Sequence, residues 1–177
     1  MGRIRIGEEA PRFELLGVDG KRYSLNTFQD KVVVVVMFTT NHCPYVQAYE
    51  DRLIAIQKDY ASRGVALVAI NSNEDKNYPE DSFENMIKRA KNRGFNFPYL
   101  RDATQSVATA YGAQYTPEIF VLNKERRLVY HGRIDDNWKD PAKGGGKDLR
   151  EALDAMLEGK LPAKPETQAF GCTIKWA

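Results

Sequence analysis

The longest uninterrupted apolar stretch of the chain runs from Val32 to Phe38 and consists mostly of valine. A continuous run of β-branched residues, with no alternation of apolar and polar positions, is typical of a strand that is buried on both faces of a sheet. The run is far shorter than the about twenty residues that a membrane-spanning helix needs. The pattern therefore predicts a central parallel strand over 31–38.

A helical repeat follows that strand. Apolar or aromatic side chains recur every three or four positions after Pro44, at Val46, Tyr49, Leu53, Ile56 and Tyr60. This spacing predicts an amphipathic helix that Gly64 can end. A second buried strand is expected over 65–70, so that the three segments form a βαβ unit.

Shorter patterns predict the remaining elements. Two antiparallel hairpins are expected, one over 13–24 around the turn Asp19-Gly20 and one over 118–131. A helix beginning at Pro79 presents one apolar face, and its expected members are Phe83, Met86, Ile87 and Ala90. An extended segment over 97–100, a short helix over 105–111 and a last helix complete the series. In the last helix Asp148 and Glu151 are expected to form a capping pair.

The end of the chain does not continue the last helix. Prolines interrupt 159–177, which is expected to lie on the domain as an arm, and its apolar ending from Phe170 to Trp176 suggests docking. The run 143–147 (Lys-Gly-Gly-Gly-Lys) lacks the preceding strand and the following Ser or Thr of a phosphate loop, so we expect a flexible lead into the last helix. With no linker and no repeat, residues 1–177 are predicted to form a single domain.

Composition narrows the range of functions. The 26 Lys and Arg residues nearly balance the 24 Asp and Glu residues, which disfavours nucleic acid or an anionic membrane as partner. No apolar segment follows the N-terminal arginines, so cytoplasmic localisation is expected. Two cysteines are too few for a disulfide scaffold or a four-ligand zinc site, and Asp135-Asp136 is expected to be a solvated turn. No metal and no cofactor is therefore predicted.

Cys43 falls where the central strand ends and a helix begins, directly before Pro44. The free amides and the positive dipole end of a helix stabilise a thiolate there, and a protonated His42 would add to this effect. We expect an accessible, reactive Cys43, although many free cysteines are merely small buried hydrophobes. His42 either tunes the thiol or is a solvated loop residue. Thr40 either hydrogen-bonds the thiolate or a bound oxidant, or is an ordinary threonine at a strand end.

Cys172 lies in the apolar ending of the arm. If the arm packs near Cys43, Cys172 can attack an oxidised or mixed-disulfide form of Cys43, provided that their Cα atoms come within about 7 Å. The alternative is a terminal hydrophobic clasp in which the cysteine is incidental. The sequence leaves both interpretations open.

Taken in order, several short motifs resemble the thioredoxin/peroxiredoxin superfamily along nearly the whole chain. The chain is most similar to the peroxiredoxin-like bacterial proteins often described as redoxins or thiol-disulfide isomerases. The motifs are Ala10-Pro11-Arg12-Phe13, the Asp-Gly hairpin, 41–46 (NHCPYV), 97–102 (FPYLRD), Tyr111-Gly112, Thr116-Pro117-Glu118 and 171–176 (GCTIKW). The resemblance implies an α/β thioredoxin-like fold with a central mixed sheet flanked by helices. It also implies a cis peptide bond at Pro117, which would place the Thr116 backbone beside Cys43 as a docking edge for a peptide or thiol substrate.

The chain departs from each branch of that superfamily. Val46 stands where thioredoxins have their second cysteine, and Met37 where they have a buried acid. Val36 replaces the proline of peroxiredoxins, and Thr116 and Pro117 stand near the place of their activating arginine. Thr40 and Cys43 do match the peroxiredoxin Thr-x-x-Cys.

These residues predict a thiol-dependent oxidoreductase in which the Cys43 thiolate attacks a disulfide or a peroxide. Cys172 or an external thiol, such as a thioredoxin-type electron donor, then regenerates it. Disulfide exchange is favoured over efficient peroxide reduction, because the activating arginine is missing. The alternative is a redox-inert binding module that holds a peptide or protein partner in the groove at Thr116 and Pro117.

Overall fold

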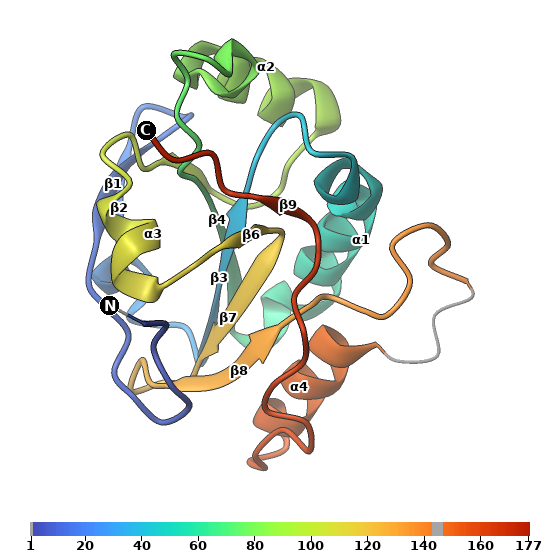
Figure 1. The fold of residues 1–177 in the computed structure, drawn as a ribbon. Coiled ribbons are helices and arrows are strands. Elements are labelled where there is room, and N and C mark those ends of the chain that lie inside the picture. Colours follow the sequence, from blue (N-terminus) through green and yellow to red (C-terminus); the bar gives the residue numbers. More distant parts are fainter. Residues whose placement is uncertain (1, 143–146) are drawn as a thin grey trace.

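A computed structural model describes residues 2–142 and 147–177 and shows one seven-stranded mixed sheet (Figure 1). The strand order is β2-β1-β5-β4-β3-β7-β8. The strands are β1 (Glu14–Gly17), β2 (Arg22–Ser24), β3 (Val33–Thr39), β4 (Val65–Asn71), β5 (Tyr99–Arg101), β7 (Glu118–Leu122) and β8 (Leu128–Gly132). The predicted central strand is β3, which pairs parallel with β4 and antiparallel with β7.

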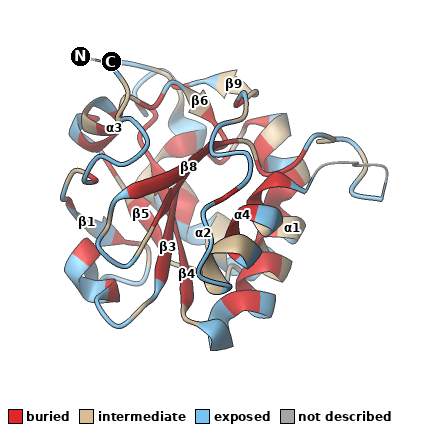
Figure 2. Ribbon diagram, turned by 90° about the horizontal axis from the view of Figure 1, so that it is seen from below, coloured by how far each residue is buried: buried red, intermediate tan, exposed pale blue. Residues whose placement is uncertain are grey.

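The helices lie on both faces of this sheet. They are α1 (Pro44–Tyr60), α2 (Phe83–Arg93), α3 (Ser106–Tyr111) and α4 (Asp148–Leu157), with three short 3-10 turns, η1 (Leu25–Phe28), η2 (Ala61–Arg63) and η3 (Pro79–Asp81). Alternate residues of β3 face two separate cores: Val33, Val35 and Met37 pack with α1, α2 and α4, whereas Val34, Val36 and Phe38 pack with α3 and η1. All seven β3 residues are consequently buried (Figure 2), as the valine run predicts. Within the described residues, no helix combines the length and apolar character needed to span a bilayer.

The helix predicted from Pro79 divides into two parts. Pro79 opens η3, and Ser82 then caps α2 by accepting a hydrogen bond from the Asn85 amide at 3.2 Å. The prediction that Ile87 belongs to the apolar face is wrong, because this side chain is 40% exposed whereas Met86 is fully buried. The break leaves Asp81 pointing into the protein, with consequences for the site described below.

Near α4, one expectation is wrong and another concerns residues that the structure does not describe. Asp148 does not cap α4; its Oδ2 instead accepts a hydrogen bond from Arg133 Nε at 2.8 Å. The flexible lead predicted over 143–147 falls mainly on residues 143–146, outside the described residues.

The C-terminal arm lies against the rest of the chain and contains a short strand near its end. Residues of β9 (Cys172–Thr173) pair antiparallel with β6 (Tyr115–Thr116), the strand directly before Pro117. Figure 1 shows this two-stranded sheet across the ends of β3 and β7. The arm therefore crosses the sheet edge at which Cys43 is located.

Candidate active site

Cys43 occupies the junction between β3 and α1. It is the N-cap residue of α1, its carbonyl accepts the first helical hydrogen bond from Gln47, and Pro44 is the first helical residue. Proline suits this position because the amide that it lacks would have no partner within the helix. The local sequence thus fixes the sulfur at the carboxyl end of the central strand.

The sulfur of Cys43 is enclosed. The residue has an exposed fraction of 0%, and Sγ lies 3.5 Å from the Thr116 carbonyl oxygen, to which the thiol donates. Among the described residues of α1, none of the first backbone amides donates a hydrogen bond to Sγ. The expectation of an accessible sulfur held by helix amides is therefore wrong for the structure with the arm docked. The physical reason is that the chain's own C-terminal strand covers the sheet edge.

The pairing of β6 with β9 brings Cys172 to Cys43. Cys172 lies opposite Thr116 in the register, and its side chain is close enough to Cys43 for the two sulfurs to interact. Burial, followed by the interaction with the neighbouring Cys43, raises the pKa of Cys172 to about 11. Cys172 consequently keeps its proton at neutral pH. Both cysteines are free thiols.

The Thr116-Pro117 peptide bond is cis, as the family resemblance implies. The Thr116 carbonyl oxygen contacts Cys43 Sγ. Gly171 of the arm also passes directly over this oxygen. A Cβ atom added to Gly171 would lie 2.1 Å from the Thr116 oxygen, so only glycine allows this approach. The edge expected to dock a substrate is thus present, and β9 occupies it.

On the other side of Cys43, a buried carboxylate that the sequence analysis missed organises the loop. Asp81, from η3, is fully buried. It accepts hydrogen bonds from Thr40 Oγ1 at 2.7 Å, the Asn41 amide at 2.7 Å, Asn71 Nδ2 at 3.0 Å and Asn73 Nδ2 at 3.1 Å. Burial alone raises the pKa of Asp81, but these hydrogen bonds outweigh it and hold the pKa below the ordinary value of 3.8. Asp81 is therefore ionised at neutral pH and places a negative charge near the site.

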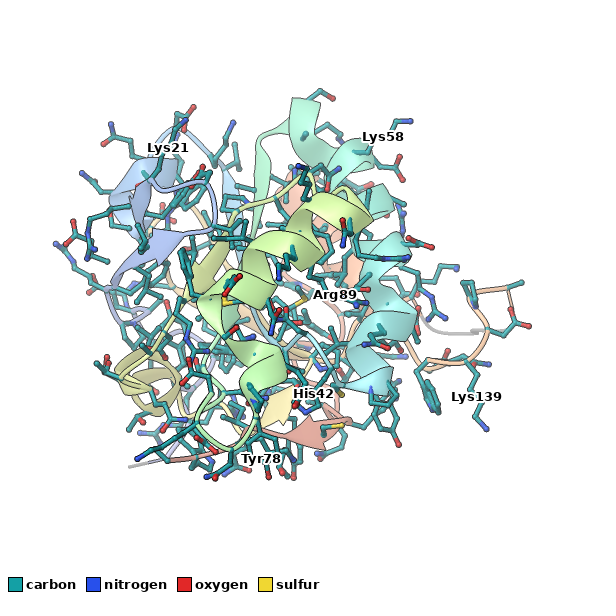
Figure 3. The ribbon with its side chains drawn as sticks, turned by 90° about the horizontal axis from the view of Figure 1, so that it is seen from above. Lys21, His42, Lys58, Tyr78, Arg89 and Lys139 are labelled. Atoms are coloured by element: carbon teal, nitrogen blue, oxygen red, sulfur yellow. The ribbon has the colours of Figure 1, made fainter. Side chains whose placement is uncertain are left out.

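His42 and Thr40 belong to this cluster. His42 Nδ1 lies 2.5 Å from Asp81 Oδ2 and 3.2 Å from Thr40 Oγ1, and its ring stacks on Tyr78 with centroids 5.9 Å apart (Figure 3). Among the described residues, neither side chain has a hydrogen bond to Cys43. Their roles in tuning the thiol or binding an oxidant stay predictions. Only the spacing of Asn41, Asn71 and Asn73 after two strands could have hinted at a polar cluster here.

A second buried pair supports the cis-proline segment. Glu118 Oε1 accepts from the amides of Gln114 and Tyr115 at 2.8 and 2.9 Å, and its Oε2 lies 2.6 Å from His131 Nε2. Glu118 and His131 are both buried, and both line a cavity of about 260 Å³. The pair fixes the strand that contacts Cys43 without itself touching the sulfur.

The expectation of a solvated turn at Asp135-Asp136 is wrong for Asp135, whereas Asp136 is exposed. Asp135 is buried and accepts hydrogen bonds from Tyr49 Oη at 2.7 Å and Arg52 at 2.9 Å, so it ties the segment after β8 to α1. In the described ranges, no three His, Cys, Asp or Glu side chains gather in a way that could hold a metal ion.

Comparison with known proteins agrees with this geometry. Residues 6–131 match the AhpC/TSA family. Over 126 residues the chain is 30% identical to the thiol-disulfide oxidoreductase ResA of Bacillus subtilis, and the match covers 71% of this chain and 66% of that relative. The chain thus spans just under two thirds of the length of this curated relative.

Two solved structures set the fold in context. A hypothetical protein from Sinorhizobium meliloti 1021 shares 42% identity over 99% of this chain and 97% of its own, with a TM-score of 0.92. Peroxidoxin BcpB from Mycobacterium tuberculosis shares 18% identity over 89% of this chain and 98% of its own, with a TM-score of 0.69. The second similarity confirms the predicted thioredoxin-like fold. The family match covers most of the chain, and the chain therefore belongs to the AhpC/TSA family.

Proposed function

We propose that the protein is a thiol-dependent oxidoreductase in which Cys43 is the nucleophile and Cys172 resolves the intermediate. The single observation that carries this proposal is the register of β9 on β6, which pairs Cys172 with Thr116, the residue whose carbonyl contacts Cys43 Sγ, and so brings the two thiols close together. The name of the Bacillus subtilis relative supports thiol-disulfide chemistry.

The chemistry divides into three balanced steps. The Cys43 thiolate attacks one sulfur of a substrate disulfide, forming a mixed disulfide and releasing the other sulfur as a thiolate. Cys172 loses its proton and attacks the Cys43 sulfur, so that the substrate leaves as its second thiol and a Cys43–Cys172 disulfide remains. A dithiol donor then reduces this disulfide, is itself oxidised, and restores both thiols.

The substrates and partners follow from this cycle. The oxidant is a protein or small-molecule disulfide or a peroxide, and the regenerating donor is a thioredoxin-type dithiol. Disulfide exchange is favoured over efficient peroxide reduction, because no arginine within the described residues hydrogen-bonds Cys43. The cytoplasm and an antioxidant role fit a reaction in which Cys43 starts each cycle reduced.

Intact-mass measurement of the full chain after one equivalent of an oxidant tests the proposal. We expect a loss of two mass units and a peptide linking Cys43 to Cys172. Cys172→Ser should accumulate a mixed disulfide or sulfenic acid on Cys43, and Cys43→Ser should give neither. A redox-inert binding module would leave the mass of the wild-type chain unchanged, and that result would refute the oxidoreductase.

A further inference from the structure

The strand edge beside Cys43 is already paired with main chain from the same molecule. Tyr115 pairs with Thr173 and Thr116 pairs with Cys172, in antiparallel register. An extended polypeptide that binds a sheet edge uses these same main-chain groups. The edge therefore cannot accept a second strand while β9 is docked.

Contacts before β9 hold the arm close to the site. The Phe170 ring packs edge-on against Tyr45, two residues after Cys43, with centroids 5.9 Å apart. Farther back, the Thr167 amide donates to the His131 carbonyl at 3.0 Å, and the His131 amide donates to the Pro165 carbonyl at 2.9 Å. The arm is thus fastened along β8 before it reaches β6.

Contacts after β9 fasten its other end. The Ile174 amide donates to the Gln114 carbonyl at 2.9 Å, and the Ile174 side chain is only 3% exposed. The Lys175 amide donates to Asn73 Oδ1 at 2.9 Å, and Gln105 Nε2 donates to the Lys175 carbonyl at 2.8 Å. Because the strand is anchored on both sides, its displacement requires these bonds to break together.

From this arrangement we propose that the arm occupies, within the same molecule, the edge of β6 at which a polypeptide substrate would bind. We propose further that the protein reacts with small, non-peptide oxidants while its arm is docked. This inference rests on the proposed function and names its substrate class. A small peroxide or a low-molecular-weight disulfide makes no strand pairing with β6, so it does not compete with β9 for this edge. A protein disulfide must replace β9, so its rate scales with the fraction of molecules in which the arm is open.

Both small oxidants give a balanced first step. With a peroxide, the Cys43 thiolate takes one oxygen, and the O–O bond breaks to release an alcohol or water after protonation. With a small disulfide, an S–S bond forms on Cys43 and one thiolate leaves. In either case Cys172 is already positioned to close the disulfide, releasing water or the second thiol.

The test isolates the first step in a Cys172→Ser background, so that resolution does not mask it. Full-length protein is treated separately with hydrogen peroxide, 2-hydroxyethyl disulfide and insulin, and the modification of Cys43 is followed by quenched mass spectrometry. Each rate is divided by the rate of N-acetylcysteine with the same oxidant. We expect the normalised rate with insulin to be at least about tenfold below both small-molecule rates, since an arm opening that breaks even one hydrogen bond leaves about a tenth of molecules open.

Two glycine variants in that background provide the matched comparison. Gly171→Ala adds a methyl group against the Thr116 oxygen and should loosen β9, raising the insulin rate about tenfold relative to the small-oxidant rates. Gly159→Ala also substitutes a residue with positive φ on the same arm, but a Cβ there meets nothing within 4 Å, so the ratio should not change. Phe170→Ala offers an independent way to loosen the arm if Gly171→Ala does not fold.

The outcomes separate the two proposals. Equal normalised rates for insulin and the small oxidants, or ratios unaffected by both Gly171→Ala and Phe170→Ala, would overturn the arm as occupant while leaving the oxidoreductase intact. No modification of Cys43 by any of the three oxidants would instead overturn the proposed function itself.

Discussion

The two flanks of Cys43 are built from different kinds of interaction. On the His42 side, a fully buried carboxylate, Asp81, gathers hydrogen bonds from hydroxyl, amide and imidazole groups. On the Thr116 side, the contact is main-chain pairing with β9, a segment from the far end of the chain. The first flank depends on specific side chains, whereas the second offers hydrogen bonds that any extended strand could make.

This difference predicts that one flank of the site is fixed and that the other can open. Removing one partner of a buried charge leaves the others without a substitute, so the Asp81 flank stays fixed. Main-chain pairing at an edge can be lost and regained at lower cost, because water satisfies the freed groups. We therefore expect the loop before Cys43 to be rigid and the arm to open locally.

The largest expected effect comes from Asp81→Ala. The change leaves several buried donors around the former carboxylate without an acceptor, and we expect a loss of about 3 to 5 kcal/mol in the free energy of unfolding. Urea denaturation measures it. The control is Glu80→Ala, whose side chain is 52% exposed and should change stability by less than about 0.5 kcal/mol. Similar losses in both variants would contradict the role of Asp81.

A smaller and more local effect is expected for Ile174→Ala. Truncating this buried side chain should weaken arm docking by about 2 kcal/mol and speed hydrogen exchange of the residue 174 amide about thirtyfold. Ile87→Ala is the matched control, because Ile87 is 40% exposed on α2. Exchange that accelerates equally throughout the sheet would show that the arm does not open separately.

The thiol pair gives a prediction about acidity. Burial is the largest cause of the raised pKa of Cys172, and the interaction with Cys43 adds to it. Cys43→Ser should therefore lower the pKa of Cys172 from about 11 toward its ordinary value of 9.0 without reaching it. The rate of alkylation by iodoacetamide as a function of pH measures the shift, and an unchanged profile would show that the two sulfurs do not interact.

The smallest expected effect is the pH dependence that Asp81 contributes. Its pKa is lower in the folded chain than the ordinary value of 3.8, so its contribution to stability is complete above that value. The contribution is lost as the pH falls toward the lower pKa of the folded state. Urea denaturation at a series of pH values should show a steeper loss below about pH 4 in the wild type than in Asp81→Asn. Parallel curves would be inconsistent with a lowered pKa.

The sequence predicts the fold well where burial alone decides it. Each of three local patterns fits one kind of element: the valine run a buried strand, the apolar repeat an amphipathic helix and the turn glycines a hairpin. Accordingly, β3, α1 and both hairpins lie close to their expected positions. The junction at Cys43 and the cis bond before Pro117 are also confirmed, the latter from the family resemblance.

The sequence does not predict what depends on distant pairing. Asp81 looks like one of several acidic residues in a polar stretch, and only the break between η3 and α2 turns it toward Thr40. Similarly, no local pattern indicates that Cys172 would lie opposite Thr116, because strand register across the chain is set by the complete fold. The same register explains why the expected exposure of Cys43 was wrong.

The meeting of Cys43 and Cys172 has a consequence for the lifetime of the protein. A covalent bond between them would enclose α1, α2, α3 and α4 within one ring of roughly 130 residues, and a cross-link of that span restricts the unfolded chain strongly. Oxidised molecules would then withstand heat and proteases better than reduced ones. Turnover of the protein would in this way follow the redox balance of its surroundings.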